Sequence, residues 1–227
     1  MRIRNLIIGD IKFQYKYGFY FVYTVFTILY ISLIYFLPEQ WKEKATTIMI
    51  FSDPAAMGLF FMGAIVLLEK SQMVLNSIAV SPVKVTEYIM SKVVSLGFVS
   101  TAVGVLIAIS AGLENLISVI IGIFLGSTIF TLLGLIVAAN IHSLNQFIVA
   151  TIPLGIISFL PPIFYIFGYD KIFMLIHPGC ILIRLISGNV EWIFFLITIM
   201  FMWIGLFYFI TYRIIKKMFQ GVGGVRL

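Results

Sequence analysis

Few side chains in this sequence are of the types that carry out chemistry, and they are scattered. The chain contains no G-x-x-x-x-G-K-[ST] loop, which would hold the phosphates of ATP, and no H-E-x-x-H pair, which would bind zinc. Neither of its two histidines, His142 and His177, has an adjacent cysteine or carboxylate pair, so we expect no metal site. The single cysteine, Cys180, cannot form an internal disulfide. We therefore predict that the chain is not an enzyme and binds no cofactor directly.

Asp53 is the exception, because it is an ionisable residue inside a long apolar segment. It precedes Pro54, and proline is favoured at the first position of a helix, where an aspartate can accept hydrogen bonds from the free N–H groups. We expect Asp53 to cap a helix that begins at Pro54. The alternative is a functional contact with a transported molecule or a proton, since ionisable side chains inside a membrane often mark a transport path.

The composition indicates that such residues must be positioned by membrane helices. Of the 227 residues, 62% are hydrophobic and 11% charged, against about 45–50% and 25% in a typical soluble domain. The apolar stretches are about 20 residues long, enough to cross the hydrocarbon core as helices. We predict an all-α polytopic membrane protein, with a single transmembrane domain over residues 1–227. Its six spans are Phe19–Leu37, Thr47–Leu68, Val93–Ala111, Leu116–Ala139, Phe147–Phe167 and Trp192–Tyr212.

Two further segments are apolar but too short or too broken to span. Residues 1–17 carry isoleucines at four-residue spacing among charged residues, which predicts an amphipathic helix on the membrane surface. Residues 168–191 contain two short apolar runs interrupted by charged residues and by Pro178. We expect them to form a re-entrant pair of short helices on the outer face, between spans five and six.

The positive charges are distributed unevenly between the two sides that six spans define. The formal net charge is +6, which in a soluble protein could indicate nucleic-acid binding, but here the basic residues flank apolar runs and predict lipid headgroup contacts instead. One side holds Arg2, Arg4, Lys12, Lys16, Lys70, Lys84, Lys92, Arg213, Lys216, Lys217 and Arg226, and the other holds Lys42, Lys44, Lys171 and Arg184. We therefore expect both termini in the cytoplasm, in the plasma membrane of a prokaryote.

Small residues and prolines in the fourth and fifth spans leave two interpretations open. Gly122 and Gly126 form a G-x-x-x-G step that would allow close helix approach, either inside the bundle or at a subunit interface. Pro153 and the Pro161-Pro162 pair should distort the fifth span, either beside a cavity or dimer seam or through packing alone.

Residues 69–92 form the most distinctive segment. They leave a span with Glu69-Lys70, continue as a short amphipathic helix, turn at Ser81-Pro82 and re-enter the membrane after Lys92. This segment resembles the coupling loop between the second and third spans of type-2 ABC export permeases, with the pattern E-[RK]-x-x-G-x-L-x-x-L-x-V-[ST]-P-x-x-x-x-E-[YI]-x-x-x-K. The matching residues are Glu69, Lys70, Leu75, Val80, Ser81, Pro82, Glu87, Tyr88 and Lys92, whereas Met73 stands at the glycine position and Ile78 at the second leucine position.

Two other segments extend the resemblance. Residues 51–58 and 63–69 resemble the fluoroquinolone-exporter-like branch of these permeases, and His177-Pro178 with Arg184 is similar to its Asn-Pro segment. The resemblance implies cytoplasmic ATP-binding-cassette ATPase subunits as separate chains carrying ATP and Mg, and a second permease copy or paralogue. It also implies ATPase-coupling contacts through Glu69, Lys70, Leu75, Ile78, Val80, Ser81, Pro82 and Tyr88.

The abundance of Phe and Tyr and the scarcity of charge in the spans predict an amphipathic or hydrophobic substrate. Three other interpretations remain at this point. Residues 69–92 could be an ordinary basic loop. The chain could also be a non-transporting immunity or scaffold protein, or a membrane-embedded enzyme, for which Asp53 alone would qualify as a catalytic group.

Overall fold

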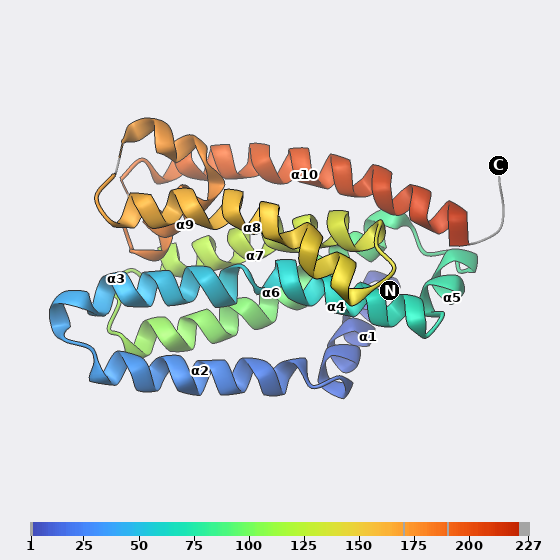
Figure 1. The fold of residues 1–227 in the computed structure, drawn as a ribbon, viewed down its shortest axis with the longest axis horizontal. Coiled ribbons are helices and arrows are strands. Elements are labelled where there is room, and N and C mark those ends of the chain that lie inside the picture. The colour runs from blue at the N-terminus through green and yellow to red at the C-terminus, as the bar shows by residue number, and fades with distance from the viewer. Residues whose placement is uncertain (1, 170, 190, 223–227) are drawn as a thin grey trace.

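The computed structural model describes residues 2–169, 171–189 and 191–222, without the side chains of Ala79 and Val222. All regular elements within these ranges are helical, which confirms the all-α prediction (Figure 1). The elements are α1 Arg2–Lys16, α2 Phe19–Phe36, α3 Glu39–Ile50, the π turn η1 Phe51–Ala55, α4 Met57–Ser71, α5 Val74–Val80, α6 Val85–Ser110, α7 Leu116–Ala139, α8 Leu144–Ile166, the 3₁₀ turn η2 Ile172–Ile176, α9 Pro178–Ile186 and α10 Ile193–Val222.

Six helical stretches in the described ranges are long and apolar enough to cross a membrane, as predicted. They are Phe19–Phe36, Glu39–Ser71, Val85–Ser110, Leu116–Ala139, Leu144–Ile166 and Ile193–Gly221. Three of the spans are longer than predicted. The second begins at Glu39, the third begins at Val85, and the sixth ends beyond Tyr212. Backbone hydrogen bonding continues past the end of the apolar run, so hydrophobicity alone places these helix ends too early. Arg226, which the sequence analysis counted among the basic residues of one side, lies outside the described residues.

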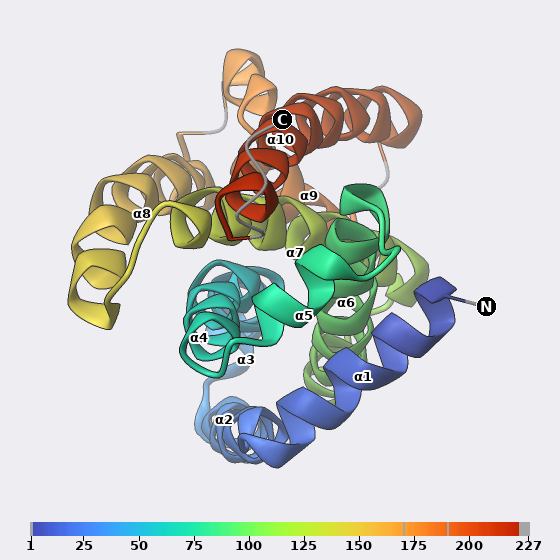
Figure 2. The same ribbon diagram turned by 90° about the vertical axis from the view of Figure 1, so that its right-hand side faces the viewer.

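Helix α7 is the centre of the bundle. It packs against α4, α6, α9 and α10, and Figure 2 shows it between α4 and α6 on one side and α8 to α10 on the other. Close packing depends on its glycines: a Cβ on Gly134 would lie 2.7 Å from the backbone oxygen of Leu59, and one on Gly122 would lie 3.0 Å from Leu185 Cβ. The G-x-x-x-G step thus serves packing inside the bundle, against α9.

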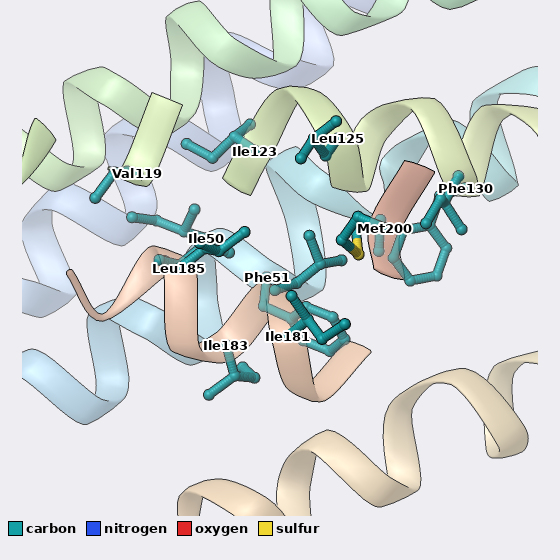
Figure 3. Packing of buried hydrophobic residues seen from close by; sticks show 14 of the residues in the cluster. Ile50, Phe51, Val119, Ile123, Leu125, Phe130, Ile181, Ile183, Leu185 and Met200 are labelled. Atoms are coloured by element: carbon teal, nitrogen blue, oxygen red, sulfur yellow. The ribbon is translucent and has the colours of Figure 1, made fainter. Parts of the chain in front are cut away.

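The segment after α8 forms two short helices, η2 and α9, as predicted. His177 caps α9 by accepting a hydrogen bond from the Gly179 N–H on Nδ1 at 3.1 Å, and Ser118 of α7 donates to the Leu185 oxygen at 2.8 Å. Helix α9 is largely buried against α7, and Figure 3 shows Ile181 and Leu185 among the side chains of η1 and α7. Because so short a helix is buried among longer ones, it fills a gap in the bundle without crossing it.

The second span is continuous, so the predicted helix start at Pro54 is wrong. Helices α3 and α4 join through η1, Asp53 lies within that π turn, and no side-chain cap forms at either helix junction. Proline lacks an N–H and clashes with the carbonyl four residues earlier in an α-helix. A π turn widens the backbone at this point, so the helix passes Pro54 without ending.

Candidate functional site

The end of the bundle that carries α1 and α5 collects most of the residues singled out in the sequence, and we call it the α5 end (Figure 1). Glu69 and Lys70 lie in the last turn of α4 and therefore belong to the second span. They are not part of the short helix that follows. Their side chains bind different neighbours, so the adjacent pair fastens α4 to two parts of the chain.

Glu69 belongs to a buried ion cluster that joins three helices. The ammonium group of Lys92 on α6 pairs with Glu69 and also with Asp10 on α1, at 2.5 Å. The Tyr88 hydroxyl donates to the second Glu69 oxygen at 2.7 Å, and its ring lies 5.1 Å from the Lys92 nitrogen. Lys92, Glu69 and Tyr88 are at most 3% exposed. A buried charge is strongly stabilised only when its partners are all in place, so this cluster favours one arrangement of the three helices.

Asp10 was not recognised as a site residue in the sequence. It follows Ile7 by three residues and precedes Gln14 by four, which places all three on one face of α1. Gln14 donates to the Ser95 hydroxyl of α6 at 3.0 Å, and Ser95 lies three residues after Lys92. Two polar residues on the inner face of an otherwise amphipathic helix were the available signal. The surface helix is thus tied to the third span by two polar contacts one turn apart.

Lys70 caps the end of α7. Its ammonium group donates to the backbone oxygens of Ala138 at 2.8 Å, Ala139 at 2.9 Å and Ile141 at 2.7 Å. The last carbonyls of a helix have no partner within it and carry partial negative charge, so a lysine is a suitable cap. This contact fixes the end of the second span to the turn between α7 and α8.

Met73 starts the short helix α5 in a left-handed backbone conformation, with φ of 55°. Residues other than glycine rarely adopt it, since Cβ then approaches the carbonyl oxygen. The resemblance places glycine at this position, and the backbone geometry gives the reason. Arg2 of α1 donates to the Pro82 oxygen at 3.1 Å, so α1 also contacts the turn after α5.

The predicted coupling residues divide into two groups. Leu75 is 1% exposed and packs within its own chain, as do Glu69 and Tyr88, while Ile78 is half-buried. Ser81 donates to the Ile78 oxygen at 2.7 Å and ends the helix. The outward residues of α5 and its ends are Met73, Asn76, Ser77, Val80 and Pro82, with Met73 67% and Val80 80% exposed. Met73 and Val80 thus form an exposed apolar pair beside the polar residues Asn76 and Ser77.

The described basic residues are also concentrated at the α5 end. The course of the helices places the larger predicted group there, from Arg2 to Lys217, and the smaller group at the opposite end (Figure 1). Several of the larger group have structural partners, as Lys70 and Lys92 show. The remaining lysines and arginines are available to lipid headgroups.

Comparison with known proteins extends this description. The model of the fluoroquinolones export permease protein family matches residues 2–216. Two curated proteins named fluoroquinolones export permease protein, from Mycobacterium tuberculosis strains CDC 1551 / Oshkosh and ATCC 25618 / H37Rv, are each 28% identical over 141 residues. The alignments cover 61% of this chain and 60% of each relative. No solved structure matches.

Proposed function

We propose that this chain, which belongs to the fluoroquinolones export permease protein family, is the membrane subunit of an ATP-driven exporter of amphipathic molecules. The family description supports export through a permease, and six apolar helices support a multi-pass membrane protein. The finer statements are our inference: the ATP-binding-cassette partner, the substrate class and the orientation. The relatives are named for fluoroquinolones, which suggests an aromatic amphipathic substrate here as well.

The observation that carries the proposal is the way α5 is attached to the membrane helices. This helix of seven residues connects two spans, buries Leu75 on its inner side, and leaves Val80 and the preceding Met73 exposed. Helix α5 packs against α4 and α10, and the Lys92 cluster and the Lys70 cap join α4 to α1, α6 and α7. A displacement of α5 by a partner would therefore move several spans together. The partner needs to favour one arrangement by only a few kcal/mol to switch the permease.

ATP and Mg would be held by a separate ATPase, because the chain lacks a phosphate-binding loop. We place its contact on the outward face of α5 and the Ser81-Pro82 turn. Leu75, Glu69 and Tyr88 would act indirectly, by holding that face in position. The proposal requires the α5 end to lie in the cytoplasm, which is also the orientation that the charge distribution predicts.

A second permease copy or paralogue would complete the transporter. Helices α2, α8 and α10 expose long apolar faces, and less than a quarter of the apolar window of each is buried. Lipid covers most of this surface. A cavity between two permeases would open alternately as the ATPase pair closes.

Co-expression with the ABC ATPase encoded nearest to the gene tests the proposal. We expect the two chains to co-purify, and inverted vesicles to accumulate norfloxacin, a fluorescent fluoroquinolone, only with ATP. The control is an ATPase with its phosphate-loop lysine replaced by alanine. Co-purification without ATP-dependent accumulation of any amphipathic dye would favour the scaffold interpretation. The absence of any ATPase partner would refute the proposal.

A further inference from the structure

A cavity of about 250 Å³ lies where α10 begins, at the end of the bundle opposite the α5 end (Figure 1). One wall is formed by η2, including Phe173 and Ile176, and the other by the first turns of α10, including Phe195 and Ile199. Arg184 of α9 is the one charged residue among the described residues that line it. The cavity therefore combines apolar walls with a single positive charge.

The charge of Arg184 is compensated only in part by the surrounding chain. Its side chain is 15% exposed, and Nη2 pairs with the Glu191 carboxylate at 3.1 Å. Nε has no hydrogen-bond acceptor among the described residues. Arginine keeps its proton in proteins, so this mostly buried group stays charged. Glu191 is 75% exposed, and a carboxylate so well solvated gives a weak ion pair. An anion that enters the cavity can therefore add to this pair or replace it.

The position of the cavity corresponds to the membrane–water boundary. The apolar stretch of the sixth span begins at Ile193, and Trp192, which also lines the cavity, directly precedes it. Tryptophan is enriched at this boundary, where its ring lies at the level of the lipid headgroups. The guanidinium of Arg184 thus lies at about the depth of lipid phosphates.

The walls of the cavity are open to lipid. The side chains of Phe173, Trp192 and Phe195 are each more than half exposed, and only 11% of the apolar window of α10 is buried. Burial of such apolar surface against an acyl chain is favourable and needs no other part of the protein to move aside. A tail can therefore enter from the membrane while its headgroup stays at the boundary.

We propose that this cavity binds an anionic phospholipid, with the phosphate on Arg184 and the first part of an acyl chain between η2 and α10. A guanidinium matches the geometry of phosphate oxygens and forms strong charge-assisted hydrogen bonds with them. Inorganic phosphate would leave the apolar walls uncovered. A zwitterionic lipid would bring its own cation close to Arg184 and should bind less well. Because η2, α9 and α10 all line the cavity, the bound lipid would hold these three elements together.

The first experiment uses Trp192 as the reporter, in a permease whose other tryptophans are replaced by Trp41→Phe and Trp203→Phe. The protein is reconstituted in mixed bilayers of phosphatidylglycerol and phosphatidylcholine, with one of the two lipids brominated to quench tryptophan fluorescence. Quenching should show a preference for phosphatidylglycerol of at least about threefold. Equal quenching by the two lipids would overturn the proposal. Sodium benzoate, a soluble aromatic carboxylate, should not reduce the quenching. A reduction would show that the cavity takes a soluble anion in place of a lipid.

The second experiment tests the charge in the same reporter background. Arg184→Gln should abolish the preference for phosphatidylglycerol, whereas Lys44→Gln, at an exposed lysine of the same end, should retain it. Glu191→Gln should increase the preference, because it removes the carboxylate that competes for the guanidinium. A preference that persists in Arg184→Gln would overturn the inference. If that variant does not fold, Glu191→Gln decides, and an unchanged preference there counts against the site.

The inference goes beyond export and requires only that the chain lies in a membrane. Both leaflets of the reconstituted bilayer contain the anionic lipid, so the result is independent of orientation. No ATPase is present in either experiment. Failure of the lipid site is therefore distinguishable from failure of the proposed export function.

Discussion

Asp10 of the surface helix and Lys92 of the third span form an ion pair of 2.5 Å across 82 positions of the sequence. Lys92 is shared with Glu69, so removing the lysine leaves one buried and one partly buried carboxylate without their cation. The Asp10–Lys92 pair therefore connects α1 to the same lysine that joins α4 to α6. The contribution of this ion pair to the stability of the fold can be measured directly.

Lys92→Met should strongly destabilise the permease. Breaking a buried pair by removing one partner typically costs about 3–5 kcal/mol, because the other charge stays buried and unpaired. Unfolding by SDS in mixed micelles should shift to a lower SDS fraction. Adding Asp10→Asn and Glu69→Gln should restore part of the loss, while Lys12→Met, at an exposed position on α1, should have little effect. An unchanged transition in Lys92→Met would show that the cluster is not stabilising.

Met73→Gly should stabilise the fold. Met73 has φ of 55° and a mostly exposed side chain, so glycine relieves backbone strain at little cost in packing. The expected gain is about 1 kcal/mol, visible in the same unfolding assay. Asn76→Gly, three residues later inside α5, should instead cost up to about 1 kcal/mol. A destabilised Met73→Gly would contradict the strained geometry at the start of α5.

Val80→Asp should disrupt partner binding without disrupting the fold. Val80 is 80% exposed, so a charge there meets solvent in the free permease and an apolar contact in the complex. We expect normal monodisperse yield but a loss of ATPase co-purification of at least about tenfold. His142→Asp, at another exposed position of the α5 end, should bind normally.

Leu75→Asp should behave differently from Val80→Asp. Leu75 is 1% exposed in the core of its own chain, so the aspartate would be buried and folded yield should fall. Yield is measured before co-purification, because an unfolded chain cannot report on binding. Normal folding of Leu75→Asp would show that this side of α5 faces outward, contrary to the structure.

Cysteine labelling should place the α5 end in the cytoplasm. A membrane-impermeant maleimide should label Lys44→Cys in intact cells but label Asn76→Cys only after the cells are opened. The native Cys180 should stay unlabelled, because burial raises its pKa to about 12 and keeps the thiol protonated near pH 7. Labelling of Asn76→Cys in intact cells would reverse the orientation.

The sequence by itself determined the membrane class and the six helices, because the length and polarity of each apolar run are local properties. It also indicated the surface helix, the short helices after the fifth span and the distinctive loop, whereas the glycine position at Met73 came from the resemblance to the permease family. These features depend on hydrophobic period and turn chemistry, which a single segment contains.

Only the tertiary structure decided the roles of the individual polar residues. Helices of similar hydrophobicity can pack in many ways, so nothing local identified Asp10 as the partner of Lys92 or the end of α7 as the partner of Lys70. The inward direction of Leu75 likewise depends on where α10 lies. Asp53 looked like a helix cap because Pro54 follows it, whereas the neighbouring helices support a continuous span through a π turn. Local sequence specifies the backbone tendency at Pro54, and the surrounding helices decide whether the span ends or continues there.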